Sequence, residues 1–141
     1  MSSLSLPLAA EELIPHRLPM RLVEQLLEID GKNGVVAAKI GADCPLVDSH
    51  GKFEEVALVE LIAQSYASLK GYLDRLEQRP VRQGFFVGIK KMDWFRAVQV
   101  QEELLIKVRT LAELGDFAVA EGEVWQQEAL VARGEIKVWI D

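Results

Sequence analysis

One long helical segment constrains the fold of this chain more than any other feature of its sequence. Residues 53–78 contain no proline and only one glycine, Gly71. Within them, apolar and small side chains recur at spacings of three and four residues, with a second row beside the first, at Leu58, Val59, Ile62, Ala63, Ser65, Tyr66, Leu69, Leu73 and Leu76. Two adjacent rows make the first two-thirds of such a helix apolar nearly all round. We therefore expect a helix over residues 53–78 that is buried on most of its sides.

Extended segments flank this helix. Before it, residues 20–30 and 35–40 are predicted to form a hairpin, because Gly31-Lys32-Asn33-Gly34 between them supplies turn chemistry. After it, the predicted strands are 84–94, 104–114, 117–125 and 129–140. The last strand alternates between apolar and charged side chains, which is typical of a sheet with one face in a core.

The order of these elements predicts an α+β domain in which an antiparallel sheet wraps over the helix. Residues 8–13 are expected to add one or two helical turns that end before Pro15, and residues 1–7 a loose lead-in to a single domain spanning 1–141. One helix cannot cover a sheet of five or six strands. We therefore expect the sheet to pair with a second copy of the chain.

Composition excludes several classes of function. The 22 acidic and 16 basic side chains give a net charge of −6, which argues against non-specific nucleic-acid binding. No apolar run approaches the roughly 20 residues of a membrane span, and residues 1–8 lack the basic start of a signal peptide. One cysteine, Cys44, and two histidines argue against a metal centre built from these residues, and no cofactor is expected. We expect a cytoplasmic protein.

Glu60 is the candidate catalytic acid. It is the only ionisable carboxylate or amine between Glu55 and Lys70, in a stretch that is otherwise apolar or small. Burial penalises a lone charged carboxylate, which favours its protonated form and suits it to donate a proton. Alternatively, Glu60 lies on the one solvated stripe of the helix. Gln64, one turn later, either steadies Glu60 or satisfies a backbone group.

A histidine is the natural second participant, because Cys44 and the scattered serines have no activating neighbour in the sequence. His50 lies in the polar loop before the helix, ten positions upstream of Glu60, and can reach that helix or the one in a partner subunit. Simple exposure of this loop histidine is the alternative. His16, between two prolines, is either a structural hydrogen-bonding residue or a second candidate base.

Three stretches together resemble a known family. They are residues 13–30 (LIPHRLPMRLVEQLLEID), 58–65 (LVELIAQS) and 84–98 (GFFVGIKKMDWFRAV). In this order they are similar to the PHR-x-P, acid-hydrophobic-Ala-Gln and Gly-Ile-x-x-hydrophobic-x-Phe-Arg motifs of bacterial 3-hydroxyacyl-(acyl-carrier-protein) dehydratases of the hotdog fold. The resemblance covers about residues 13–108. The loop before the helix is shorter than in that family and looks more like the divergent dehydratase-like proteins of aryl polyene biosynthesis clusters.

The resemblance implies a hotdog fold and a dimer that shares its active sites between subunits. It implies that Glu60 is the catalytic acid and that His50 is the counterpart of the catalytic histidine, although Ser49-His50-Gly51 stands where the family has Gly-His-Phe-Pro. Free backbone N–H groups at the helix start, at Val56 and Ala57, would polarise a thioester carbonyl. Supporting positions are then Gln64 and Gly88.

The implied reaction is removal of water from a 3-hydroxyacyl thioester on an acyl carrier protein. The alternatives are a hotdog thioesterase, in which Glu60 activates water, and a non-catalytic acyl-binding partner of a dehydratase paralogue. The second subunit is expected to be either an identical chain or such a paralogue.

Residues 79–96 are the candidate docking site for the acidic carrier protein and its phosphopantetheine. This stretch has a single acidic residue against five basic ones, namely Arg79, Arg82, Lys90, Lys91 and Arg96. The alternative is a solvated strand edge protected by its lysines.

Overall fold

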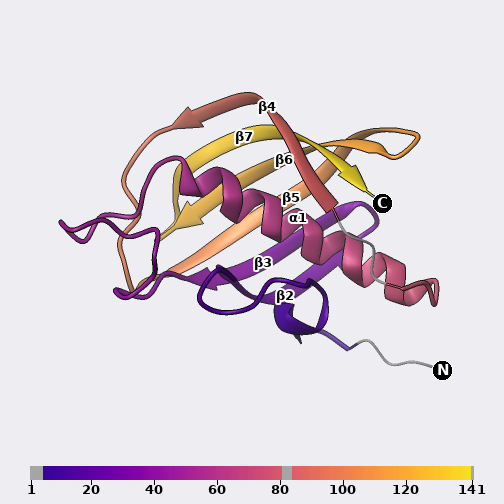
Figure 1. The fold of residues 1–141 in the computed structure, drawn as a ribbon, viewed down its shortest axis with the longest axis horizontal. Coiled ribbons are helices and arrows are strands. Elements are labelled where there is room, and N and C mark those ends of the chain that lie inside the picture. Colours follow the sequence, from indigo (N-terminus) through magenta and orange to yellow (C-terminus); the bar gives the residue numbers. More distant parts are fainter. Residues whose placement is uncertain (1–4, 81–83, 141) are drawn as a thin grey trace.

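A single curved sheet wraps around one long helix in the computed structural model, which describes residues 5–80 and 84–140 (Figure 1). The elements in chain order are β1 (Leu8–Ala9), the 3₁₀ helix η1 (Ala10–Glu12), β2 (Val23–Asp30), β3 (Asn33–Lys39), α1 (Ala57–Leu76), β4 (Gly84–Trp94), β5 (Glu103–Leu114), β6 (Phe117–Gln126) and β7 (Ala129–Ile140). Within the described ranges the strands form one seven-stranded antiparallel sheet in the order β1-β2-β3-β5-β6-β7-β4. The predicted α+β class is confirmed.

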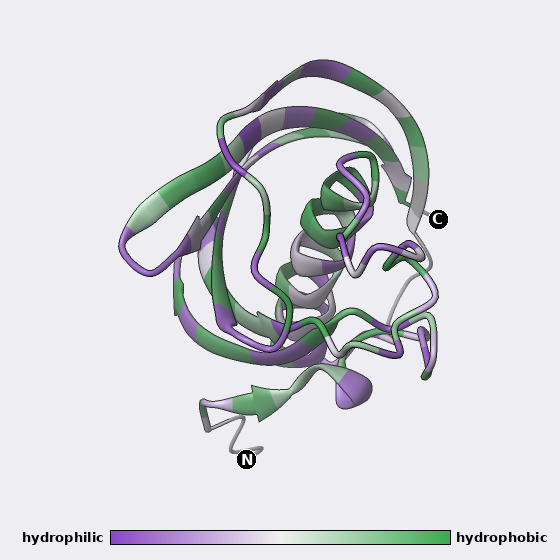
Figure 2. Ribbon diagram, turned by 90° about the vertical axis from the view of Figure 1, so that its left-hand side faces the viewer, coloured by the Kyte–Doolittle hydropathy of each residue, from purple (hydrophilic) through white to green (hydrophobic). Residues whose placement is uncertain are grey.

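The core lies between α1 and the concave face of the sheet (Figure 2). Alternate side chains of β6 and β7 face it, and Val124, Ala132 and Ile136 are fully buried there. Gly122 on β6 lies against Ile62 of the helix, where a Cβ atom would overlap that side chain. The missing side chain therefore lets α1 approach the sheet closely.

The helix is as deeply buried as its sequence predicts, but it begins later. Thirteen of its 20 residues are buried. It starts at Ala57 rather than at residue 53, because Phe53 is extended, pairs with Val47 and buries its ring in the core. The apolar side chain of Phe53 thus belongs to the loop before the helix and not to a helical row.

Two other predicted boundaries differ from the structure. Residues 10–12 form one helical turn, the 3₁₀ helix η1, as predicted, but residues 8 and 9 form the short strand β1 because they pair with β2. The first hairpin turns at Gly31 and Lys32, and Asn33 already pairs with Asp30. Gly31 takes the positive φ of +60° that the turn requires, which is a role expected of the Asn-Gly pair two residues on.

Strand β4 is an edge of the sheet and exposes apolar side chains. Phe86, Val87 and Ile89 are each about half exposed, and the pairing of β4 with β7 shifts register twice in this region. Such an edge is the kind that natural sheets cover by association. Among the described residues, α1 included, no helix is both long and apolar enough to cross a membrane.

Candidate active site

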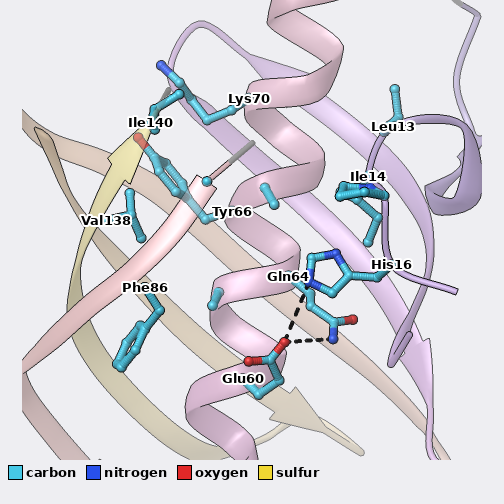
Figure 3. A pocket seen from close by; sticks show the side chains of 14 residues that line it. Leu13, Ile14, His16, Glu60, Gln64, Tyr66, Lys70, Phe86, Val138 and Ile140 are labelled. Atoms are coloured by element: carbon cyan, nitrogen blue, oxygen red, sulfur yellow. Dashed lines mark hydrogen bonds and ion pairs between the residues drawn. The ribbon is translucent and has the colours of Figure 1, made fainter. Parts of the chain in front are cut away.

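A cavity of about 360 Å³ lies between α1, the segment before β2 and the ends of β4 and β7 (Figure 3). Its lining comprises Leu13, Ile14, Pro15, His16, Glu60, Ala63, Gln64, Tyr66, Ala67, Lys70, Gly84, Phe86, Val138 and Ile140. Most of these side chains are apolar, and the few polar ones converge at specific points, as in small-molecule sites. The cavity is therefore the candidate site.

Glu60, His16 and Gln64 form the polar cluster at one end of this cavity. Nε2 of Gln64 donates a 2.8 Å hydrogen bond to Oε2 of Glu60. Nε2 of His16 lies 3.8 Å from the same carboxylate oxygen. A carboxyl group and an imidazole thus face one point at the cavity wall, which is a geometry suited to general acid–base chemistry.

Two contacts hold His16 beside the helix although 44 residues separate it from Glu60. The amide of Gln64 accepts a hydrogen bond from the N–H of Leu22 at 2.7 Å and donates to the carbonyl of Met20 at 2.9 Å, so it clamps the end of the segment to α1. At its start, Leu13 lies on Gly71, where a Cβ atom would overlap the Leu13 carbonyl oxygen. Gln64 performs both roles considered for it, since it contacts Glu60 and satisfies backbone groups.

The structure distinguishes the two environments considered for Glu60. The side chain is not enclosed among apolar neighbours: in the single chain it is 42% exposed, as the alternative of a solvated stripe predicts. Because Glu60 both lines the cavity and is partly exposed, it lies at the mouth of the cavity. Desolvation of this carboxylate therefore requires a bound ligand or a second subunit.

His50 does not line the cavity. It is exposed in a tight loop in which its N–H and that of Lys52 both bind Oδ1 of Asp48, at 2.8 and 3.0 Å. Gly51 completes the loop with a φ of +78°. In the single chain the structure thus brings His16, and not His50, to Glu60.

One of the two backbone N–H groups at the helix start that were expected to polarise a thioester carbonyl is not free. The N–H of Ala57 donates to the carbonyl of Glu54 at 3.0 Å, so it is not free to polarise a substrate. The cause is a tight turn over residues 54–57 that precedes α1. Val56 is exposed at this turn, and Gly88 lies on β4 with open space around its Cα, outside the residues that line the cavity.

The expected docking residues divide into two groups. Lys90, Lys91 and Arg96 are exposed on or just after β4. Arg79 instead closes the end of the helix, where it pairs with the buried Asp74 at 2.9 Å and with Glu77 at 3.1 Å. Arg82 lies outside the described residues.

Sequence reasoning missed Lys70, which lines the end of the cavity opposite Glu60 (Figure 3). Its Nζ donates to Oε1 of Glu113 at 3.0 Å, and Lys32 donates to Oε2 of Glu113 at 2.7 Å. The hydrogen bonds from Lys32 and Lys70 lower the pKa of Glu113 to about 2. Lys70 is ten residues after Glu60 and six after Gln64, spacings at which helical residues do not share a face, so the local sequence pattern contains no signal for its place in the cavity.

Acid–base chemistry by side chains is what the residues of the site support. Across residues 5–80 and 84–140, His, Cys, Asp and Glu nowhere gather in a group of three or more that would hold a metal ion. The polar end offers a proton donor and acceptor within 3.8 Å of one another. The apolar walls offer space for an acyl chain.

A helix held inside a curved antiparallel sheet is the hotdog fold, and solved hotdog structures superpose on this chain. The dehydratase heterocomplex ApeI:P from Xenorhabdus doucetiae matches with a TM-score of 0.87 at 19% identity, over 95% of this chain and 91% of that one. A hypothetical thioesterase with coenzyme A from Streptococcus pneumoniae matches with a TM-score of 0.65 at 14% identity, over 82% and 84% of the two chains. These likenesses establish the fold.

Sequence comparison defines the family. The model of the ApeP-like family, described as ApeP dehydratase, matches residues 8–140. Curated relatives include the 3-hydroxyacyl-(acyl-carrier-protein) dehydratases FabZ of Clostridioides difficile, 29% identical, and of Natranaerobius thermophilus, 28% identical, each over 89% of this chain and 90% of the relative. The chain belongs to the ApeP-like dehydratase family, and the resemblance to hotdog-fold dehydratases that the sequence motifs indicated is confirmed.

Proposed function

We propose that this protein removes water from 3-hydroxyacyl thioesters carried on an acyl carrier protein, at the cavity that Glu60 opens onto. The observation that carries the proposal is the carboxyl of Glu60, steadied by Gln64 and faced by His16, at the mouth of an apolar cavity. Membership of the ApeP-like dehydratase family and similarity to FabZ dehydratases support the same reaction.

The reaction needs one base and one acid. The base takes the proton on the carbon next to the thioester carbonyl, and the electron pair forms the new double bond as the 3-hydroxyl leaves. Glu60 gives its proton to that hydroxyl, so the products are water and the 2-enoyl thioester. The acyl chain then extends along the apolar walls of the cavity.

The base is a histidine, and the geometry supports His16 within one chain. Its Nε2 faces Glu60 at 3.8 Å, while its Nδ1 is buried without a hydrogen-bond partner in the described part of the chain. His50 is exposed in its loop, so it serves as base only if it reaches the Glu60 of a second subunit.

Mixing inactive variants distinguishes the two histidines. If the base is His50 of the other subunit, a mixture of the Glu60→Gln and His50→Ala proteins contains one complete site per hybrid dimer and regains dehydration. If His16 and Glu60 act from the same chain, a mixture of Glu60→Gln and His16→Ala regains nothing. Mixtures are refolded together, and the rate of enoyl product formation is measured.

We propose that the protein works as a dimer in which β4 lies at the interface. The half-exposed Phe86, Val87 and Ile89 on this edge strand support an association that covers them. The second subunit is an identical chain or a paralogue; similarity to a dehydratase heterocomplex supports the paralogue. Sedimentation of the protein alone, and with a co-expressed paralogue, gives the composition of the assembly.

Mass spectrometry of a 3-hydroxyacyl carrier protein tests the reaction itself. The carrier is incubated with the protein alone and with the paralogue. The proposal predicts loss of one water from the acyl group. Hydrolysis to the free carrier thiol indicates a thioesterase instead. Loss of water that occurs only with the paralogue, and that persists when this chain carries Glu60→Gln, indicates a non-catalytic subunit; both results contradict the proposal.

A further inference from the structure

The two ends of the candidate cavity differ in chemistry. Glu60 lies at one end, and the side chain of Lys70 reaches the other (Figure 3). Ten residues of α1 separate them, which corresponds to about 15 Å along the helix axis. Most of the wall between them is apolar, including Ala67, Val138 and Ile140, and the hydroxyl of Tyr66 forms a 2.9 Å hydrogen bond with Thr110. An acyl chain that starts at Glu60 and follows this wall therefore ends at the side chain of Lys70.

Lys70 is held in a cluster that carries surplus positive charge. Its side chain is only 15% exposed, and Glu113 is its ion-pair partner at 3.0 Å. The same carboxylate also serves Lys32 at 2.7 Å, so one negative charge faces two positive ones. An ammonium group has three N–H donors, and the bond to Glu113 occupies one of them.

We infer that the cavity selects acyl chains whose far end carries a hydrogen-bond-accepting oxygen, and that Lys70 is the residue that selects them. The inference rests on the proposed function, because it takes the thioester to lie at Glu60. A chain that ends in a methyl group desolvates the Lys70 ammonium and returns no hydrogen bond. A hydroxyl or carboxylate oxygen at the end of the chain accepts a hydrogen bond from one of the other two N–H groups of the Lys70 ammonium.

The test compares matched substrates with the unaltered protein. The substrates are 3-hydroxyacyl pantetheine thioesters of hexanoyl to dodecanoyl length, each ending in a methyl, hydroxyl or carboxylate group. For the longer chains, kcat/KM is expected to favour an oxygen-ended substrate about tenfold or more over the methyl-ended one, mainly through KM. Hexanoyl chains are expected to show no preference, because their ends stop short of Lys70. Comparison of the hydroxyl-ended with the carboxylate-ended substrates identifies which oxygen is preferred.

Two variants assign the preference to a residue. Lys70→Met removes the charge from the cavity and is expected to abolish the preference. Lys32→Met, the matched control, removes the other ion pair of Glu113 but leaves the cavity lining intact, so the preference is expected to remain. Melting temperatures of both variants report whether they fold. If Lys70→Met does not fold, the inference is still tested by whether the preference for oxygen-ended substrates of the unaltered protein appears only with the longer chains.

Two results overturn the inference. One is equal use of methyl-ended and oxygen-ended chains at every length by the unaltered protein. The other is a preference for oxygen-ended chains that remains in a folded Lys70→Met protein, which would show that Lys70 lines the cavity without selecting the substrate. If no substrate is dehydrated, the proposed function fails separately. The inference about Lys70 is then tested by calorimetric binding of the corresponding unreactive acyl-pantetheine amides, where tenfold tighter binding of the oxygen-ended amides is expected.

Discussion

Gln64 donates a 2.8 Å hydrogen bond to Glu60 from one helical turn away, and the same amide binds the backbone at Leu22 and Met20. Replacing Gln64 with Leu leaves the buried N–H of Leu22 and the partly buried carbonyl of Met20 without these partners. The free energy of unfolding is expected to fall by about 2 kcal/mol or more, measured by urea denaturation. Ser68→Ala is the matched control, because the hydroxyl of Ser68 donates to a carbonyl of its own helix, and the effect of the change is expected to be below about 1 kcal/mol. Equal effects of the two changes would contradict the role of Gln64 as a clamp.

Gly71 allows Leu13 to lie on the helix, so a methyl group there tests the path of the N-terminal segment. Alanine favours a helix over glycine by about 1 kcal/mol, but in Gly71→Ala the new Cβ meets a backbone oxygen that cannot move alone. We expect a net destabilisation of about 1–3 kcal/mol, seen as a lower melting temperature, together with slower dehydration because His16 moves with the segment. Gly88→Ala is the control, since no atom lies within 4 Å of its added Cβ. A stabilised Gly71→Ala protein would show that the segment does not pack as described.

Glu113 makes stability depend on pH in the acid range. Its pKa in the folded chain is about 2, below the ordinary value of 4.5, because Lys32 and Lys70 donate hydrogen bonds to its charged form. A lowered pKa contributes stability that is complete above about pH 4.5 and is lost as the pH falls toward 2. Since the carboxylate is partly exposed, we expect this contribution to be about 1 kcal/mol at most. The difference between the unfolding free energies of the unaltered protein and Glu113→Gln should shrink steadily as the pH falls from 4.5 toward 2; a constant difference contradicts the account.

Lys90 and Lys91 are exposed and belong to residues 79–96, the stretch predicted to dock the carrier protein. Reversing both to glutamate is expected to weaken carrier-protein binding at least fivefold at low salt, and the difference should shrink as salt screens the charges. Lys107→Glu is the control, because Lys107 is exposed on the outer face of β5, where it lies over the ring of Trp125. Binding is measured by calorimetry with the holo carrier protein. Unchanged affinity in the Lys90/Lys91 variant removes these residues from the docking surface.

The fold was predictable because its strongest signals are local. Helical spacing in residues 57–76 and alternation in residues 129–140 identify α1 and β7 without knowledge of their neighbours. The errors fall where a distant contact decides. Phe53 is extended because its ring enters the core, and residues 8 and 9 are a strand because β2 lies beside them.

The site was predictable only in part for the same reason. Glu60 and Gln64 stand out as polar residues in one apolar helix, one turn apart. The approach of His16 to Glu60 depends on contacts across 42 to 44 positions, through Leu22 and Met20, that no local pattern contains. The pairing of Lys70 with Glu113 likewise spans 43 positions. The role of His50 depends on a second subunit.

The single-turnover rate of Glu60→Gln on a 3-hydroxyacyl carrier protein tests the central claim most directly. Glutamine keeps the shape of the side chain but has no acidic proton, so the chemical step should slow by at least about a hundredfold while circular dichroism and the melting temperature stay close to those of the unaltered protein. A folded Glu60→Gln protein that forms the enoyl product at the unaltered rate would contradict the claim that this carboxyl group supplies the proton.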